Sequence, residues 1–279
     1  MTTAQRHIAA LAGQPDQNID LATGALAISS LFQPTLSPSA YLHRLDDLAA
    51  DAARRIPDQE ELLGKVAALN DYLFGELGFA GNQQDFYDPR NSFLDQVIER
   101  RLGIPISLAV IYVEVAGRLG LPAFGVGFPA HFLVRIGRGA TALMLDVYAG
   151  GVSLAEDELD RRLADVFGTG VFTIRSNPSL LRPATKREIL IRMLRNLVGV
   201  YRQRGDQANL LEALSAALTL EPDLVDELRE RGLLYRDLGY APAALADLGR
   251  FVELSDNAER IVEVEAVLAE LRARPMKLH

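Results

Sequence analysis

The stretch LGIPISLAVIYVEVAGRLGLPAFGV, residues 102–126, decides how this chain folds. It predicts a helix from Pro105 to about Arg118, because proline suits the first helical position, where its missing N–H would lack a partner anyway. Gly120 and Pro122 end this helix. After Pro122 the apolar residues alternate instead of recurring at helical spacing, which predicts strands. A buried helix followed directly by β-structure is therefore the centre of the fold.

Upstream of this stretch the sequence predicts a second helix. Ser92 and Asp95 have the spacing of a capping box, and an apolar face follows them. Gly103 stands where a helix prefers a C-terminal glycine. Asn91 and Ser92 are accordingly interpreted as capping residues.

Downstream, PAHFLVRI (129–136) and LMLDVY (143–148) predict a β-hairpin. If its turn has the two central residues Arg138 and Gly139, His131 lies directly opposite Asp146, with Cβ atoms about 5 Å apart on one side of the sheet. Other turn registers remain open, so this pairing is a hypothesis.

The rest of the chain reads as helical. Three apolar stripes at helical spacing precede residue 80, and helices return after Pro183. In that second region Tyr201 and Tyr235 are 34 positions apart, as are Gly205 and Gly239, and this interval is the tetratricopeptide period. Two degenerate copies and a closing helix over 258–273 are predicted.

The chain contains no cysteine, which excludes disulfides, thiolate zinc sites and thiol nucleophiles together. With four histidines and no recognisable ligand spacing, we expect no metal and no cofactor. A net charge of −8 argues against nucleic acid as a partner. No apolar run is long enough for a bilayer and no export signal is evident, so we expect a cytoplasmic protein without membrane contact.

Basic residues are concentrated between residues 175 and 204, where eight arginines and lysines accompany one acid, Glu188. One reading is a solvated helix face that pairs with acids elsewhere in the fold. The other is a docking surface for an acidic partner. The candidate partner-binding residues are Arg187, Arg192, Arg195 and Arg202.

The three central motifs together resemble the transglutaminase-like superfamily of cysteine-dependent enzymes. In that superfamily a Gly-x-Cys opens a helix whose N-terminus lowers the thiol pKa, a histidine leads a strand, and an aspartate on the next strand orients the histidine. The resemblance implies that Pro105 stands at the nucleophile position, His131 at the general base and Asp146 at its orienting acid. Arg118 matches the motif at the helix end.

More narrowly, NSFLDQVIERRLGIPISL (91–108) and GFPAHFLVR (127–135), joined to tetratricopeptide-like helices, resemble the SirB1 family of bacterial proteins. This resemblance implies an α+β, papain-like domain with a small antiparallel sheet, followed by an all-α region. We place the first domain at residues 1–182, helical over 1–90 with its core at 91–182, and the second at residues 183–279.

Because Pro105 has no nucleophilic atom, we expect a pseudoenzyme that binds a protein or peptide through the degenerate cleft and the helices. One alternative is a hydrolase in which His131 and Asp146 activate water. The other is a tetratricopeptide adaptor supported by the first domain. Ser107 is a poor substitute nucleophile, because it projects about 200° around the helix from position 105. The partner and the oligomeric state do not follow from the sequence.

Overall fold

The computed structural model describes residues 1–56 and 61–273. Residues 57–60 and 274–279, which the predicted helical regions include, lie outside the described residues. Contacts divide the chain into two compact units. The first comprises Gln14–Met193, and the second joins Met1–Gly13 to the chain from Leu194 onward. The predicted domain boundary between residues 182 and 183 stays a prediction.

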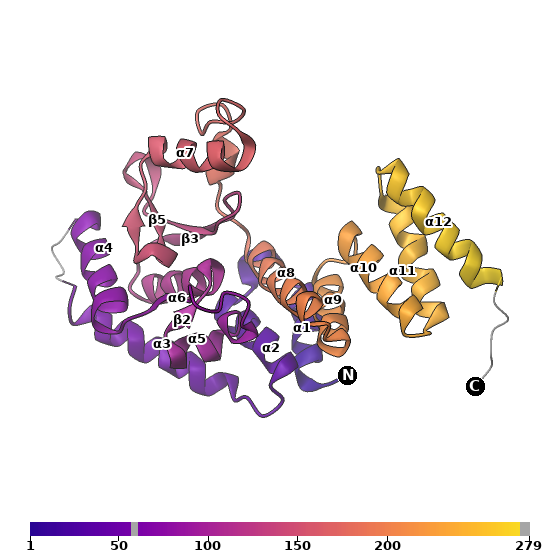
Figure 1. The fold of residues 1–279 in the computed structure, drawn as a ribbon. Coiled ribbons are helices and arrows are strands. Elements are labelled where there is room, and N and C mark those ends of the chain that lie inside the picture. Colours follow the sequence, from indigo (N-terminus) through magenta and orange to yellow (C-terminus); the bar gives the residue numbers. More distant parts are fainter. Residues whose placement is uncertain (57–60, 274–279) are drawn as a thin grey trace. The chain divides into compact units, whose positions relative to one another are not determined.

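The unit Gln14–Met193 contains helices and two small sheets (Figure 1). Its helices are α2 (Leu21–Phe32), α3 (Pro38–Ala53), α4 (Leu62–Asn70), a π-helical turn η2 (Asp71–Glu76), α5 (Leu94–Arg100), α6 (Pro105–Arg118), α7 (Glu156–Phe167) and the start of α8 (Lys186–Arg204). Its strands are β1 (Ala80–Gly81), β2 (Leu102–Gly103), β3 (Ala123–Val126), β4 (Leu133–Ile136), β5 (Leu143–Asp146) and β6 (Val152–Ser153). Strands β1 and β2 pair in parallel, whereas β3-β4-β5-β6 form an antiparallel sheet. The predicted α+β class is confirmed.

The antiparallel sheet lies between two helices, α6 below and α7 above in the view of Figure 1. Leu159 and Leu163 of α7 pack with Leu133 and Met144 from the strands. Helix α6 contacts β3 and β4, and most of its side chains are buried. It begins and ends at the predicted residues, so the stretch that was expected to be central is the core of this unit.

The register of the β4–β5 hairpin differs from the prediction. Val134 pairs with Leu145, which is two positions further along β5 than a two-residue turn at Arg138 and Gly139 requires. The connection is longer, residues 137–142, and contains the 3-10 turn η4 (Gly139–Thr141). Because side chains in a strand alternate, a shift of two positions keeps every residue on its predicted face. His131 precedes β4 and is diagonal to Asp146 rather than opposite it.

The predicted capping role of Ser92 is wrong. Phe93 holds the N-cap position of α5 and makes no side-chain cap. The backbone N–H of Leu94 donates instead to Oγ of Ser29 at 3.1 Å, a residue of α2. Ser92 itself is buried. A distant hydroxyl therefore replaces the local cap.

Gly103 does not end α5 as predicted. Arg101 takes the left-handed C-cap conformation, with φ of 58°. Gly103 lies in β2, where an added Cβ would meet Oγ of Ser107 at 2.7 Å and Val97 at 3.0 Å. The glycine is required by close packing rather than by the helix end.

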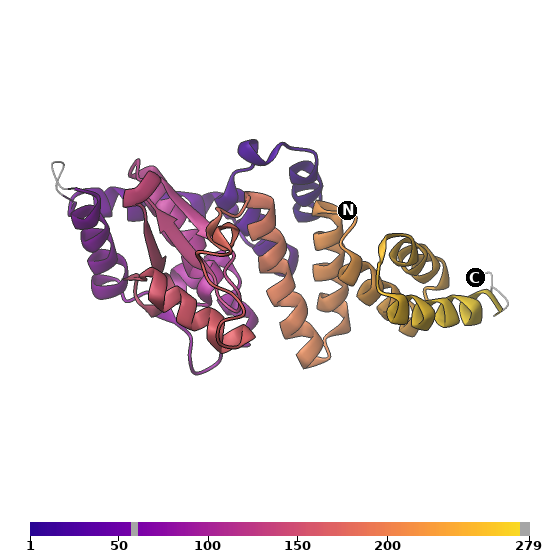
Figure 2. The ribbon, with the colours of Figure 1, turned by 90° about the horizontal axis from the view of Figure 1, so that it is seen from above.

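The second unit is all helical. It contains α1 (Thr3–Ala12), the part of α8 from Leu194 onward, α9 (Gln207–Leu220), α10 (Val225–Asp237), α11 (Ala241–Leu254) and α12 (Ala258–Ala273). In Figures 1 and 2, α8 and α9 run side by side in opposite directions. Helix α1 packs on α9, where Gln5 donates to Glu212 at 2.9 Å.

The 34-residue period has a structural counterpart. Gly205 and Gly239 follow the first helix of each copy and are left-handed, with φ of 67° and 80°. Gly232 allows α10 and α11 to approach closely, because an added Cβ would lie 2.7 Å from the side chain of Leu248. Phe251 is fully buried in the same core. The predicted pair of repeats with a closing helix is confirmed.

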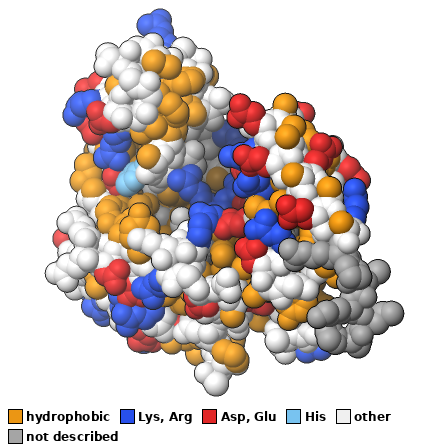
Figure 3. Space-filling view, turned by 45° about the vertical axis from the view of Figure 1, so that its right-hand side comes forward, with side chains coloured by type: hydrophobic (Ala, Val, Ile, Leu, Met, Phe, Trp, Pro, Cys, Tyr) orange, Lys and Arg blue, Asp and Glu red, His pale blue; other side chains and the backbone are white. Residues whose placement is uncertain are grey.

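Charged side chains on this unit largely pair with one another. Arg229 contacts Glu263, and Arg250 contacts Asp223. Figure 3 shows acidic and basic side chains interspersed over these helices. Such exposed pairs are screened by water and contribute little to stability.

Candidate functional site

The backbone at His131 is held in place on both sides. Ala130 has φ of 54°, a left-handed conformation that is unfavourable for a residue with a Cβ. The N–H of His131 donates to the carbonyl of Phe128 at 3.0 Å, and its own carbonyl accepts from Nη2 of Arg192 at 2.6 Å. The Arg192 guanidinium also lies 5.3 Å from the ring centre of Phe132. Backbone strain of this kind persists only where the surroundings enforce it, and it is concentrated at functional sites.

Asp146 is the last residue of β5 and is 3% exposed. Its Oδ1 accepts the backbone N–H groups of Tyr148 at 3.1 Å and Ala149 at 3.2 Å, which caps the 3-10 turn η5 (Val147–Ala149). The carboxylate orientation is therefore fixed by the main chain that follows it.

The structure brings His131 and Asp146 together despite the changed register. Nε2 of His131 lies 2.9 Å from Oδ1 of Asp146. The ring N–H is not aligned with the carboxylate, and within the described residues the buried Nε2 has no hydrogen bond. The two side chains are thus in close contact without an aligned hydrogen bond. Because Nε2 faces Asp146, Nδ1 is the ring nitrogen left for a ligand.

A third side chain completes this group. Arg162 of α7 donates from Nη1 to Oδ2 of Asp146 at 2.8 Å, and from Nε to Glu158 at 3.3 Å. Burial alone would raise the pKa of Asp146, but the contacts with His131 and Arg162 outweigh it and lower that pKa to about 2. The carboxylate is therefore ionised at neutral pH.

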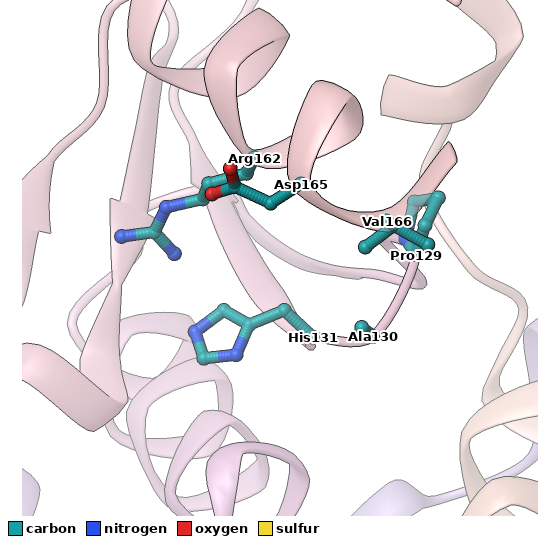
Figure 4. Close-up of a pocket in the computed structure, with 6 residues that line it drawn as sticks. All are labelled: Pro129, Ala130, His131, Arg162, Asp165 and Val166. Carbon is teal, nitrogen blue, oxygen red and sulfur yellow. The ribbon is translucent and has the colours of Figure 1, made fainter. Parts of the chain in front are cut away.

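His131 is accessible from a surface depression of about 240 Å³. The depression is lined by Pro129, Ala130, His131, Arg162, Asp165 and Val166. In Figure 4, Arg162 extends from α7 toward the imidazole, and Asp165 and Val166 come from the same helix. The side chain of His131 is 19% exposed, although the neighbouring Phe128 and Phe132 are buried.

Pro105 is the first residue of α6 and is half-buried. Ser107 is fully buried, and its hydroxyl donates to the carbonyl of Asn91 at 2.6 Å while accepting the N–H of Ile104 at 3.0 Å. Its oxygen is therefore committed to holding the loop before the helix. Ser107 cannot serve as the missing nucleophile without dismantling that loop.

Tyr148 lies next to both strand β1 and His131. Gly81 pairs with Gly103 across β1 and β2, and an added Cβ on Gly81 would lie 2.2 Å from the Tyr148 ring. The same ring is perpendicular to the imidazole of His131, with centres 6.3 Å apart. The tyrosine ring therefore lies next to both the β1 backbone at Gly81 and the histidine.

Two exposed aromatic side chains extend this surface. Phe86 is 45% and Tyr87 54% exposed, and the Phe86 ring is 6.5 Å from that of Tyr148. Their loop is fixed by buried Asn91, which donates to the carbonyl of Asp85 at 2.7 Å and accepts from Asn82 at 3.0 Å. The sequence had suggested that Asn91 caps a helix. Its side chain instead holds this loop in place.

The four candidate arginines all have partners inside the protein. Arg187 donates to the carbonyl of Gln14, and Arg192 holds the carbonyl of His131. In the other unit Arg195 contacts Glu227 and Arg202 contacts Glu230. Within the unit Gln14–Met193, Arg182 contacts Glu188, the single acid of the basic stretch. These contacts account for much of the basic stretch. Partner binding by the four residues stays a prediction.

Arg118, the remaining motif residue, contacts Asp46 and Glu114 at the end of α6.

Arg162, Tyr148 and the aromatic loop were not found by sequence reasoning. Helix α7 has a readable signal in EDELDRRLADVF (156–167), with acids in the first turn and Leu159 and Leu163 one helical turn apart. No local signal shows that its arginine reaches Asp146.

Residues 1–56 and 61–273 contain neither a candidate metal site nor a candidate membrane span. No group of three or more histidine, aspartate or glutamate side chains is placed to hold a metal ion. None of the helices there combines the length and the apolar character that a bilayer crossing requires.

Comparison with known proteins identifies the family. Residues 39–195 match the family described as the transglutaminase-like superfamily. The chain belongs to this superfamily. Residues 197–269 of this transglutaminase-like protein match the tetratricopeptide repeat. No solved structure matches it.

Its relatives confirm the predicted SirB1-like family. A UPF0162 protein of Xylella fastidiosa is 38% identical over 273 residues, 96% of each chain. Protein SirB1 of Salmonella typhimurium is 28% identical over 239 residues, 85% of this chain and 87% of that protein. F-box only protein 21 of Homo sapiens is 33% identical over 188 residues, 63% of this chain and 28% of that much longer protein.

Proposed function

We propose that this SirB1-like protein binds a peptide segment of a partner at the cleft around His131 and catalyses no acyl transfer there. The observation that carries the proposal is Pro105 at the first position of α6, where the superfamily places its thiol. Proline offers no nucleophilic atom. The hydroxyl of Ser107 is fully buried and engaged by its own loop, so it supplies no replacement.

The remaining groups support binding. A His131–Asp146–Arg162 cluster in a surface depression presents one free ring nitrogen and fixed charges. Beside it, Phe86 and Tyr87 stand exposed on a loop fixed by buried hydrogen bonds. Exposed aromatic side chains held in one conformation contribute large contact area at low entropy cost and dominate many interfaces. The tetratricopeptide repeats add a second protein-interaction surface.

Catalysis is tested with the full chain. Amine incorporation into casein and amide hydrolysis of casein are measured for the wild type and for His131→Ala. We expect both proteins to equal the buffer blank, since no thiol is present to form an acyl intermediate. Activity that is present in the wild type and lost in His131→Ala would overturn the non-catalytic assignment.

Binding is tested with peptides selected from a random library on the wild-type chain. Phe86→Ala and Tyr87→Ala should each raise the dissociation constant of these peptides about tenfold or more, as truncation of an aromatic anchor does. Leu63→Ala is the matched control, because Leu63 is 65% exposed on α4 of the same unit and does not line the His131 depression. If neither Phe86→Ala nor Tyr87→Ala changes the affinity of the peptides, binding would be assigned to the helical unit instead.

A hydrolase that uses water is the second candidate. It is favoured by the accessibility of His131, which is not sealed beneath Phe128 and Phe132. Such an enzyme would show a bell-shaped pH dependence of hydrolysis that His131→Ala abolishes. The casein assay therefore separates the two candidates.

A further inference from the structure

A second depression, of about 310 Å³, opens over the same face of the sheet near the start of α7. Eight of its ten lining residues are glycine or apolar residues, and four of these, Met144, Leu154, Leu159 and Ile174, belong to the core beneath. Two charged side chains, Arg135 and Glu156, complete the lining. The His131 depression is lined by residues from the other end of α7, so the two sites are distinct.

Arg135 occupies an unusual position for a cation. It lies on β4 opposite Met144, on the face that α7 covers, and it is half-buried. Its side chain forms no hydrogen bond or ion pair with any residue that the structure describes. Because Arg135 lines the depression and its donors have no partner among the described residues, they are available to a ligand of opposite charge.

Glu156 is the first residue of α7 and is exposed. Its position at a helix N-terminus accounts for an acid there. Although Glu156 and Arg135 line one depression, no ion pair joins them across the described part of the chain. Opposite charges that face one space without contacting each other are complementary to a ligand that carries both charges.

We propose that this depression binds a free α-amino acid with an aliphatic side chain. Arg135 takes the carboxylate through paired N–H donors, and Glu156 takes the ammonium group. The wall around Met144, Leu159 and Ile174 accepts the side chain. The volume of about 310 Å³ is at the lower limit of ligand pockets, roughly 300–1,000 Å³, which suits a ligand of this size.

The test is calorimetric titration of the full-length protein with four probes. Leucine should bind with a dissociation constant on the order of 0.1 mM, as expected for so small a ligand. N-acetylleucine lacks the ammonium group, leucinamide lacks the carboxylate and glycine lacks the side chain, and each should bind about tenfold more weakly or not at all. Equal binding of all four, or no binding of leucine up to solubility, overturns the proposal.

Substitutions of the two charged lining residues then test which ligand group each of them contacts. Arg135→Gln should remove the preference for leucine over leucinamide, and Glu156→Gln the preference for leucine over N-acetylleucine. Arg138→Gln and Asp157→Asn are controls, since both are exposed, adjacent in sequence or structure, and absent from the lining. Circular dichroism confirms that each variant is folded. Leucine binding that survives both lining substitutions, or that falls equally in the controls, contradicts the assignment.

Discussion

Replacement of Asp146 by asparagine tests the electrostatics of the candidate site. Asparagine keeps a side-chain oxygen for the N–H groups of Tyr148 and Ala149 but loses the charge that His131 and Arg162 contact. The ordinary pKa of an aspartate is 3.8, and in the folded protein that of Asp146 is about 2. At about 1.4 kcal/mol per pKa unit, the ionised carboxylate contributes roughly 2 kcal/mol to the free energy of unfolding.

The pH dependence has a definite sign. Because the folded state lowers the pKa of Asp146, its contribution is complete above the unfolded value near 4 and is lost as the pH falls toward 2. Asp146→Asn should therefore destabilise the protein by about 2 kcal/mol at pH 7 and by about half of that at pH 3. Urea unfolding followed by circular dichroism measures both values, with one transition fitted for each unit.

Asp165→Asn is the matched control for this experiment. Asp165 lines the same depression, but it is exposed and no ion pair engages it among residues 1–56 and 61–273. Its substitution should change the free energy of unfolding by less than about 0.5 kcal/mol at either pH. A destabilisation by Asp146→Asn that is equal at pH 7 and pH 3 would refute the charge-based reasoning.

Two pairs of substitutions test the packing. Gly232→Ala should destabilise the helical unit by about 1–3 kcal/mol, because its Cβ would lie 2.7 Å from Leu248. Gly249→Ala, a helical position with nothing within 4 Å, should stabilise it by up to about 1 kcal/mol, and urea unfolding that ranks the two the other way contradicts the repeat packing. Ser107→Ala should cost about 1–3 kcal/mol because two buried backbone groups lose their partner, whereas Ser30→Ala, which removes a hydrogen bond within one helix, should cost less than about 1 kcal/mol. Equal unfolding midpoints for the two serine variants would exclude a structural role for the Ser107 hydroxyl.

Local signals made much of the fold predictable. Proline at the first position and glycine after the last turn mark the two ends of α6. The 34-residue period predicted the repeat helices. The contact between His131 and Asp146 could be expected from strand alternation, because an error of two positions leaves both side chains on the same face. For the same reason the apolar pattern could not distinguish the observed register from the predicted one.

The rest depends on contacts between distant segments. The N–H of Leu94 is capped by Ser29, which no pattern around α5 could reveal. Arg162 belongs to a helix that its own sequence indicates, but its contact with Asp146 exists only because α7 packs on the sheet. Sequence patterns predict elements and their faces, whereas these partners follow from packing.

Pro105→Cys tests most directly whether Pro105 occupies the place of a lost nucleophile. Since the natural chain has no cysteine, the rate of alkylation by iodoacetamide reports the new thiol alone. If His131 and Asp146 still form the remainder of the catalytic group, the thiol pKa should fall below about 7.5, and adding His131→Gln should raise it again. A thiol pKa near the ordinary value of about 8.5, unchanged by His131→Gln, would contradict the account.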